Sequence, residues 1–328
     1  MKQMARIITK EDFIDIYTKF NQRGLNFIMS KFTFNNNART VSAFDTERDS
    51  TSHWWHVPYI QKRWNLLISG KETIDPKSYL VNRLAQEKKQ FNVLSLGTGN
   101  CYNELFYASF PEIFRSITCV DITENNLINA QKIAQENEYT NINFRCIDVN
   151  TTTFEPQSFD MIMFHQSLHH FCRLDSLFND KLLPTLKPDG MLFINEYVGA
   201  NRLQYPKEQI KAINKALGKI PMKYKKRKAT NLCKNKYYGS GWLRMYIADP
   251  SEAVESATIM PTIRKYFTVI EEKNYGGNLL MSVFKDIAYH FIEETPEKLA
   301  LMDDIFSIED DYLRNQPSDF VFGLYKKK

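Results

Sequence analysis

From Phe91 onward, short apolar runs alternate with segments of helical spacing, and this alternation constrains the fold more than any other feature of the sequence. The runs are nearly continuous in apolar character, as expected of strands that are buried on both faces. Seven runs are candidate strands, at residues 91–96, 116–121, 141–148, 159–166, 190–198, 267–275 and 320–325. We therefore expect a doubly wound α/β fold around a parallel sheet.

Helical spacing fills the connections between these runs. Residues 123–138 form one such segment, residues 173–190 form a second that closes in a Pro-Asp-Gly turn, and residues 278–292 and 299–313 form two more. The alternation predicts four parts: a helical extension over 1–88, a Rossmann-like core over 89–199, a basic insertion over 200–264, and the rest of the core over 265–328. In the extension, Pro58 and Gly70 predict a helix between them.

Composition narrows the class of protein. Of 328 residues, 43% are hydrophobic and 25% charged, as in an ordinary globular protein. No apolar run has the roughly 18 residues of a membrane span, and the first residues have no apolar core of signal-peptide length. We therefore expect a cytoplasmic protein. The five cysteines and six histidines have no metal-ligand spacing, so no metal site is predicted.

Charge is distributed unevenly along the chain. Residues 202–244 contain thirteen Lys or Arg and one acid, Glu208, whereas residues 286–319 contain ten acids against Lys298 and Arg314. This pattern indicates either an anionic partner or an electrostatic match within the chain.

The stretch LSLGTGNCYNEL, residues 94–105, places two glycines between the first strand and its helix. Such a turn lets backbone N–H groups approach a ligand at the start of the helix. A triphosphate-binding loop would need GxxxxGK[ST], which is absent, and a dinucleotide turn would need a third glycine where Tyr102 stands.

Acidic residues follow the second and third strands. Asp121 stands where a carboxylate can hold the two hydroxyls of a ribose. Asp148 can accept from an adenine amino group while Val149 offers its backbone N–H. Each acid could instead only cap the next helix. Two acids at the carboxyl edge of successive strands nevertheless favour an adenosyl ligand.

With these pieces the chain resembles the class I S-adenosylmethionine-dependent methyltransferases. The resemblance covers roughly residues 88–200 and rests on LSLGTGNC, CVDIT, RCIDV, FDMIMFHQSLHHF and LKPDGMLFINEY. It implies a seven-stranded, mostly parallel sheet with an antiparallel last strand, and S-adenosylmethionine as the cofactor. The residues that it assigns to the cofactor are Ser95, Gly97, Gly99, Asp121, Ile122, Asp148, Val149, His165 and Gln166. The sequence departs from the family pattern at Ser95, where an acid is usual, and at Cys101, where a third glycine is usual.

The segment after the fourth strand offers a catalytic group. Methyl transfer to a hydroxyl needs a base, and histidine suits that role near neutral pH. We favour His169 as the base and His170 as second candidate, although either could cap a helix or lie in the core. Glu196, at the end of the fifth strand, could bind substrate hydroxyls or orient a histidine, or be a surface acid.

The same segment indicates the acceptor. It has neither the Asn/Asp-Pro-Pro-aromatic motif of base-nitrogen methyltransferases nor a Pro-Cys nucleophile, which favours a small or sugar-like acceptor and O-methylation. In this family the N-terminal helices and the insertion often form lids over the substrate, and the basic insertion suits a phosphorylated or nucleotide-linked acceptor. The candidate substrate residues are Trp54, Trp55, Arg63, Arg202 and Tyr205. Residues 249–267, followed by YGG, resemble methyltransferases of bacterial surface-polysaccharide pathways.

Alternatives remain for the basic insertion and for the whole chain. Its KYKKRK run could bind RNA, which would make the protein an RNA methyltransferase, or could be a solvated lysine face. The chain could also be a cofactor-binding partner subunit without activity. The oligomeric state is left open.

Overall fold

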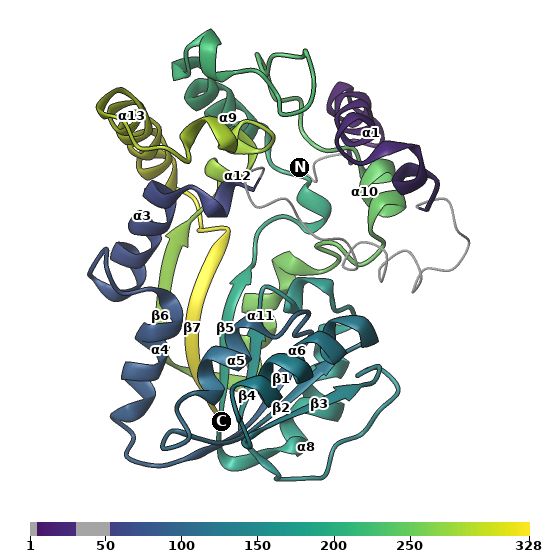
Figure 1. Cartoon of the computed structure of the whole chain (residues 1–328), viewed down its shortest axis with the longest axis vertical. Helices are drawn as coiled ribbons and strands as arrows, with labels where there is room; N and C mark the ends of the chain where they lie inside the picture. The colour runs from purple at the N-terminus through teal and green to yellow at the C-terminus, as the bar shows by residue number, and fades with distance from the viewer. Residues whose placement is uncertain (1–4, 31–52) are drawn as a thin grey trace. The chain divides into compact units, whose positions relative to one another are not determined.

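The computed structural model describes residues 5–30 and 53–328, and it divides the chain into two compact units (Figure 1). Unit 1 comprises residues 1–73, 199–252 and 275–320, and unit 2 comprises residues 74–198, 253–274 and 321–328. Within the described ranges, no helix combines the length and the apolar character needed to cross a bilayer.

A seven-stranded sheet in the order β3-β2-β1-β4-β5-β7-β6 organises the fold (Figure 1). Strands β1 to β5 pair in parallel, and the last strand is antiparallel. This confirms the predicted Rossmann-like fold and all seven strands. Their bounds are β1 Phe91–Leu96, β2 Phe114–Asp121, β3 Ile142–Cys146, β4 Phe159–His165, β5 Leu186–Tyr197, β6 Phe267–Gly276 and β7 Phe320–Lys327.

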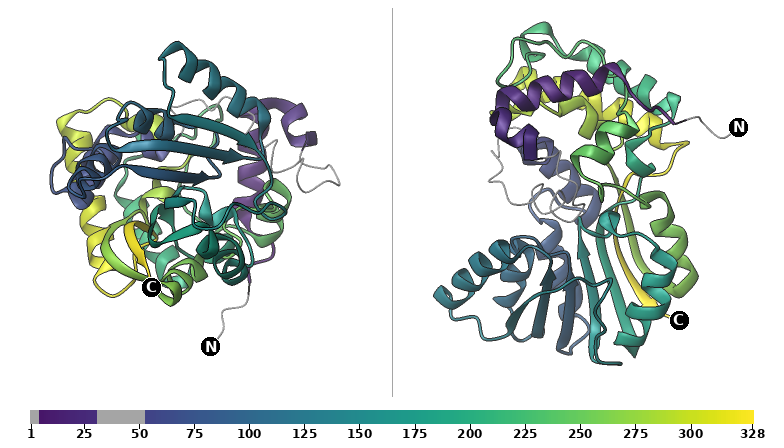
Figure 2. Two further views of the ribbon diagram at one scale, coloured as in Figure 1. Left: turned by 90° about the horizontal axis from the view of Figure 1, so that it is seen from below. Right: turned by 90° about the vertical axis from the view of Figure 1, so that its right-hand side faces the viewer.

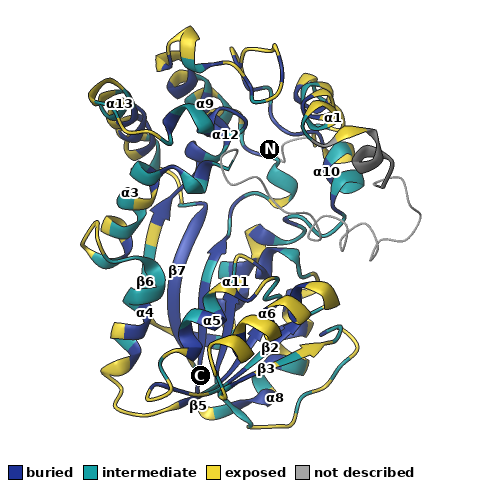
Figure 3. Ribbon diagram, viewed as in Figure 1, coloured by how far each residue is buried: buried dark blue, intermediate teal, exposed yellow. Residues whose placement is uncertain are grey.

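Helices cover both faces of this sheet in unit 2. The central strands are buried, and the helices expose their outer faces (Figure 3). Apolar residues of α7, η4, α8 and α11 form one core with Leu94, Ile162 and Leu192 of the strands. The helical segments are α4 Pro76–Ala85, α5 Tyr102–Ala108, α6 Glu124–Glu136, the 3₁₀ turn η3 Leu168–His170, α7 Leu174–Ser176, the π-helical turn η4 Leu177–Leu182, α8 Leu183–Thr185, the 3₁₀ turn η7 Ser256–Thr258 and α11 Ile259–Tyr266.

Strand β5 differs from the prediction at its start. The Pro-Asp-Gly segment at 188–190 was expected to be a turn before the strand, but β5 already begins at Leu186. Phe159 pairs with Leu186 and Met161 with Met191, so β5 contains extra residues opposite β4. The turn residues therefore form an irregularity inside the strand rather than its boundary.

Unit 1 is helical in its described residues. Helices α9, α12 and α13 pack together in it (Figures 1 and 2). Its segments are α1 Lys10–Ser30, η2 Trp54–His56, α3 Pro58–Ser69, η5 Asn201–Leu203, α9 Lys207–Lys219, η6 Met222–Tyr224, α10 Trp242–Ala248, α12 Leu280–Phe284, η8 Ala288–Phe291 and α13 Pro296–Leu313.

Two of the helix predictions in unit 1 have different outcomes. Helix α3 begins at Pro58 and ends before Gly70, which adopts φ 79°, as predicted. The single helix expected over 278–292 is wrong, because α12 ends at Phe284 and η8 starts only at Ala288. Asp286 lies between them at φ 65°, a left-handed conformation that no α-helix accommodates.

The uneven charge of the sequence is partly matched inside unit 1. Arg227 is 1% exposed, and its guanidinium donates to Asp286 at 2.6 Å and to Glu11 at 2.8 Å. On the surface, Lys219 pairs with Asp304 and Lys223 with Glu297. The charge pattern was compatible with an anionic partner or with an electrostatic match within the chain. These residues form the internal match.

A second buried ion cluster joins α1 to the same segments. Asp15 accepts from Lys285 at 2.6 Å and lies 3.1 Å from Arg244. Burial alone would raise the pKa of Asp15, but these two cations lower it well below its usual range. The cluster therefore ties the N-terminal helix to the insertion.

Replacing Arg227 with alanine is expected to lower the free energy of unfolding by about 3 kcal/mol, because two buried carboxylates lose their partner. The exposed neighbour Lys226 provides the matched control. Lys226→Ala should change the free energy of unfolding by less than about 0.5 kcal/mol. Urea denaturation of both variants measures the difference, and equal stabilities would contradict a structural role for Arg227.

Candidate active site

The glycine turn after β1 depends on three left-handed residues. Gly97, Gly99 and Cys101 have φ values of 67°, 52° and 55°. A Cβ on Gly97 would lie 2.8 Å from Cβ of Ser167, whereas a Cβ on Gly99 would meet nothing within 4 Å. Gly97 is therefore required by packing, and Gly99 borders open space. Cys101 occupies the position where the sequence lacks the family's third glycine.

Asp121, at the end of β2, is fixed by this turn. Its carboxylate accepts the backbone N–H of Gly99 at 2.8 Å and that of Thr123 at 2.8 Å. Thr123 precedes α6 but makes no side-chain capping bond. Asp121 is only partly buried, and a carboxylate has lone pairs for further donors. Its neighbour Ile122 is 41% exposed.

Asp148 and Val149 follow β3, as expected from the sequence. The carboxylate of Asp148 accepts from the backbone and the side-chain amide of Asn150, at 2.8 and 2.9 Å. Val149 is buried, and its carbonyl accepts from Lys181 at 2.9 Å. Local bonds thus hold this segment in a turn at the carboxyl edge of the sheet. Contact with adenine remains a prediction.

His165 and Gln166 end β4. The His165 ring lies between Tyr107 and Phe193, with ring centroids 5.5 and 5.0 Å away. Burial lowers the pKa of His165 to about 3, so this imidazole is neutral near pH 7. Gln166 is exposed and adopts φ 51°.

Ser95 has a partner that sequence reasoning missed. Its hydroxyl donates to Glu104 of α5 at 2.6 Å, and both residues are 1% exposed. Burial raises the pKa of the Glu104 carboxyl to about 7, and the charge of Asp121 adds to this. The sequence feature that could have indicated this pair is an acid in the first turn of the helix that follows the glycine turn. Only the folded chain shows that it points back to β1.

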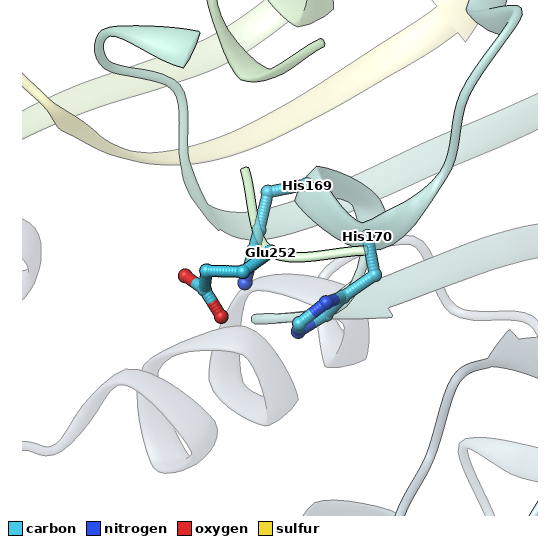
Figure 4. Close-up of side chains that lie close together, drawn as sticks. All are labelled: His169, His170 and Glu252. Atoms are coloured by element: carbon cyan, nitrogen blue, oxygen red, sulfur yellow. The ribbon is translucent and has the colours of Figure 1, made fainter. Parts of the chain in front are cut away.

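His169 and Glu196 form a buried pair. Nδ1 of His169 contacts one carboxylate oxygen of Glu196, whose side chain is fully buried. The other oxygen accepts the backbone N–H groups of Ser167 and Leu168 at 2.8 and 2.6 Å. The alternative that Glu196 is a surface acid is therefore wrong. The His170 ring lies beside that of His169, with centroids 4.2 Å apart (Figure 4).

Ser167 connects the histidine turn to the glycine turn. Its hydroxyl donates to the carbonyl of Leu96 at 2.7 Å, directly before Gly97. Its backbone N–H is bound by Glu196. The segment that carries His169 and the segment that carries Gly97 are thus joined through one residue.

The aromatic substrate candidates lie in unit 1. Trp54 is 4% exposed and packs against Trp64 and Phe320. Trp55 is partly exposed and stacks on His53 at 4.3 Å. Tyr205 is fully buried. Packing therefore accounts for Trp54 and Tyr205, and Trp55 is the more accessible of the two tryptophans.

The two arginine candidates also lie in unit 1, where both have partners. Arg63 pairs with Asp310 and packs over the ring of Phe306 at 4.7 Å. The Arg202 guanidinium donates to three backbone carbonyls, those of residues 249, 250 and 252. Contact of these side chains with a substrate remains a prediction.

The unit 2 residues fit S-adenosylmethionine. Gly99 borders open space, Asp121 stands at the carboxyl end of β2 with acceptor capacity left, and one buried oxygen of Glu104 has no hydrogen-bond partner among the described residues. Combined with the sheet order, these features are those that an α/β fold needs to bind an adenosyl ligand at the carboxyl ends of its strands, and the assignment of these residues to the cofactor stays a prediction.

Comparison with known proteins assigns the family. The family model described as a methyltransferase domain matches residues 87–270, and the chain belongs to this family. It is an S-adenosylmethionine-dependent methyltransferase, so the alternative of an inactive partner subunit is set aside. No curated protein sequence matches the chain.

Solved structures with a similar fold are distant in sequence. An S-adenosylmethionine-dependent methyltransferase from Mesorhizobium loti is 12% identical with a TM-score of 0.44, over 77% of this chain and 98% of its own. The cyclase SpnF is 13% identical with a TM-score of 0.45, over 99% of both chains. A methyltransferase from Aquifex aeolicus is 16% identical with a TM-score of 0.33, over 49% of this chain and 79% of its own.

Proposed function

We propose that this enzyme methylates a hydroxyl of a small, anionic or sugar-like acceptor, with His169 as general base. The observation that carries the proposal is the contact between His169 Nδ1 and the buried carboxylate of Glu196. A carboxylate that accepts the Nδ1 proton fixes the tautomer and places the basic lone pair on Nε2. This is the arrangement that a proton acceptor needs.

The chemistry then divides between cofactor and protein. S-adenosylmethionine supplies, when bound, a methyl group on a positively charged sulfur. The protein holds the acceptor oxygen in line at about 3–3.5 Å from that carbon. His169 takes the hydroxyl proton at Nε2, and Glu196 stabilises the imidazolium that forms. His170, whose ring lies 4.2 Å from that of His169, positions the acceptor.

The acceptor class rests on sequence and charge together. The segment after β4 has no motif for nucleic-acid bases, and Arg227 and Lys223 of the basic run pair with acids of unit 1. A small anionic acceptor is then the expectation that remains for the basic insertion at 200–264. Phosphorylated or nucleotide-linked sugars, including those of bacterial surface polysaccharides, belong to this class. Of the five candidates from the sequence, Trp55, Arg63 and Arg202 remain the proposed acceptor contacts, because Trp54 and Tyr205 are buried by packing.

Labelled cofactor tests the acceptor class. The enzyme is incubated with methyl-tritiated S-adenosylmethionine and bacterial extract separated into small anionic molecules, RNA and protein, with Asp121→Ala as the control. Label is expected in the small-molecule fraction, in a form stable to mild base as a methyl ether is. Label confined to RNA, with steeply salt-dependent RNA retention, would replace this proposal with the RNA alternative.

A further inference from the structure

Glu104 is a buried acid, and only one of its two carboxylate oxygens has a hydrogen-bond partner among the described residues. Oε1 accepts from the Ser95 hydroxyl at 2.6 Å. Oε2 is buried and has no hydrogen-bond partner within the described part of the chain. The side chain is 1% exposed. A buried carboxylate oxygen without a donor is costly, so a ligand that supplied one would be bound strongly.

The described residues supply no cation to this oxygen. Over residues 5–30 and 53–328, Glu104 forms no ion pair with a lysine or arginine. The nearby groups that titrate are Asp121 at the end of β2, Cys119 within β2, and Tyr107 on α5. Across from α5, the start of α4 contributes Asp75, which acts on Tyr107. Asp121 and Asp75 are negative, whereas Lys77 of α4 is a cation that acts on His165 and lies over the ring of Phe106. Since Lys77 forms no ion pair with Glu104 among the described residues, Oε2 is left for a cationic donor from a ligand.

The cofactor carries two positive groups, and only one of them can donate a hydrogen bond. Its sulfonium has no N–H or O–H, whereas the α-ammonium of its methionyl end has three donors. We propose that Glu104 binds this ammonium through Oε2. An acid on α5 thereby supplies the negative charge that β1 lacks at Ser95. The inference concerns the cofactor alone and does not depend on the acceptor.

Two neighbouring groups suit the same ligand. The Tyr107 hydroxyl and Nε2 of His165 are also buried without a hydrogen-bond partner among the described residues. Their rings lie 5.5 Å apart, and Tyr107 is electrostatically coupled to Glu104. A phenol oxygen and a neutral imidazole can accept the remaining N–H bonds of an ammonium.

Two adenosine compounds separate this contact from the rest of the site. S-adenosylhomocysteine has the ammonium, and 5′-methylthioadenosine lacks the whole amino-acid end. Calorimetry on Glu104→Gln is expected to show binding of S-adenosylhomocysteine weakened about 10- to 100-fold, with binding of 5′-methylthioadenosine unchanged. Glu112→Gln, at an exposed acid of the same unit, is the control and should bind both as wild type does.

Proton release provides a second readout on the wild-type protein. Burial raises the pKa of Glu104 to about 7, so part of the carboxyls are protonated near neutral pH, and an ammonium binds the ionised form. Titrations in buffers of different ionisation enthalpy should show more proton release on binding of S-adenosylhomocysteine than on binding of 5′-methylthioadenosine. Unchanged affinity for S-adenosylhomocysteine in Glu104→Gln, or equal losses of affinity for both compounds, would overturn the proposal. If Oε2 binds a water molecule instead of the ammonium, the affinity of Glu104→Gln should be unchanged.

Discussion

Replacing Asp121 with alanine is expected to weaken the binding of S-adenosylmethionine by roughly 10²- to 10⁴-fold. Two hydrogen bonds from ribose hydroxyls to a charged group are each worth about 1.5–3 kcal/mol. The substitution also frees the N–H of Gly99, which Asp121 accepts at 2.8 Å, so the glycine turn loses its anchor. Isothermal titration calorimetry measures the change.

Two further variants test whether a loss of cofactor affinity in Asp121→Ala comes from the carboxylate itself. Asp121→Asn keeps the shape of the side chain and one acceptor oxygen, so its affinity should lie between those of the wild type and Asp121→Ala. Asp180 is an exposed acid of the same unit, and Asp180→Ala should bind the cofactor normally. Wild-type affinity in Asp121→Ala would contradict the assignment of this residue to the ribose.

Replacing His169 with alanine is expected to lower kcat by roughly 10²- to 10⁴-fold and to leave cofactor affinity nearly unchanged, because proton removal from the acceptor loses its base. Steady-state rates and cofactor calorimetry on the same preparation separate the two effects. His170→Ala, at the adjacent position, removes a residue that we propose only positions the acceptor, and it should reduce kcat much less. The reverse order of effects would make His170 the base.

The role of Glu196 is resolved by combining substitutions. If Glu196 acts through His169, Glu196→Gln should lower kcat in the wild type but add little to His169→Ala. Because Glu196 also binds the N–H groups of Ser167 and Leu168, thermal unfolding of each variant must accompany the rates. Full additivity of the two effects would show that the residues act independently.

Local patterns predicted the elements with strong internal signals. The apolar run 91–96 is β1 to the residue, and Pro58 and Gly70 bound α3. The prediction failed where a distant partner decides the local conformation. Asp286 breaks the expected helix at 278–292 in a left-handed conformation, and its carboxylate binds Arg227, 59 residues earlier. No window of neighbouring residues contains that information.

The residues of the candidate site also divide into those that local patterns predicted and those that depend on distant contacts. Strand ends placed Asp121, Asp148 and His165 at one edge of the sheet, because parallel strands end together. Glu104 was missed because its significance depends on Ser95, nine residues away across a turn. Only the packing of α5 on the sheet reveals the hydrogen bond between them.

The way unit 1 is distributed along the chain has a consequence for evolution. All the cofactor candidates belong to unit 2, whereas unit 1 consists of the chain before α4, the stretch after β5 and the stretch between β6 and β7. Stretches between strands tolerate insertion and replacement far better than the strands themselves. Descendants of one ancestor can therefore replace unit 1 by rewriting these three stretches, while the cofactor candidates of unit 2 are inherited unchanged.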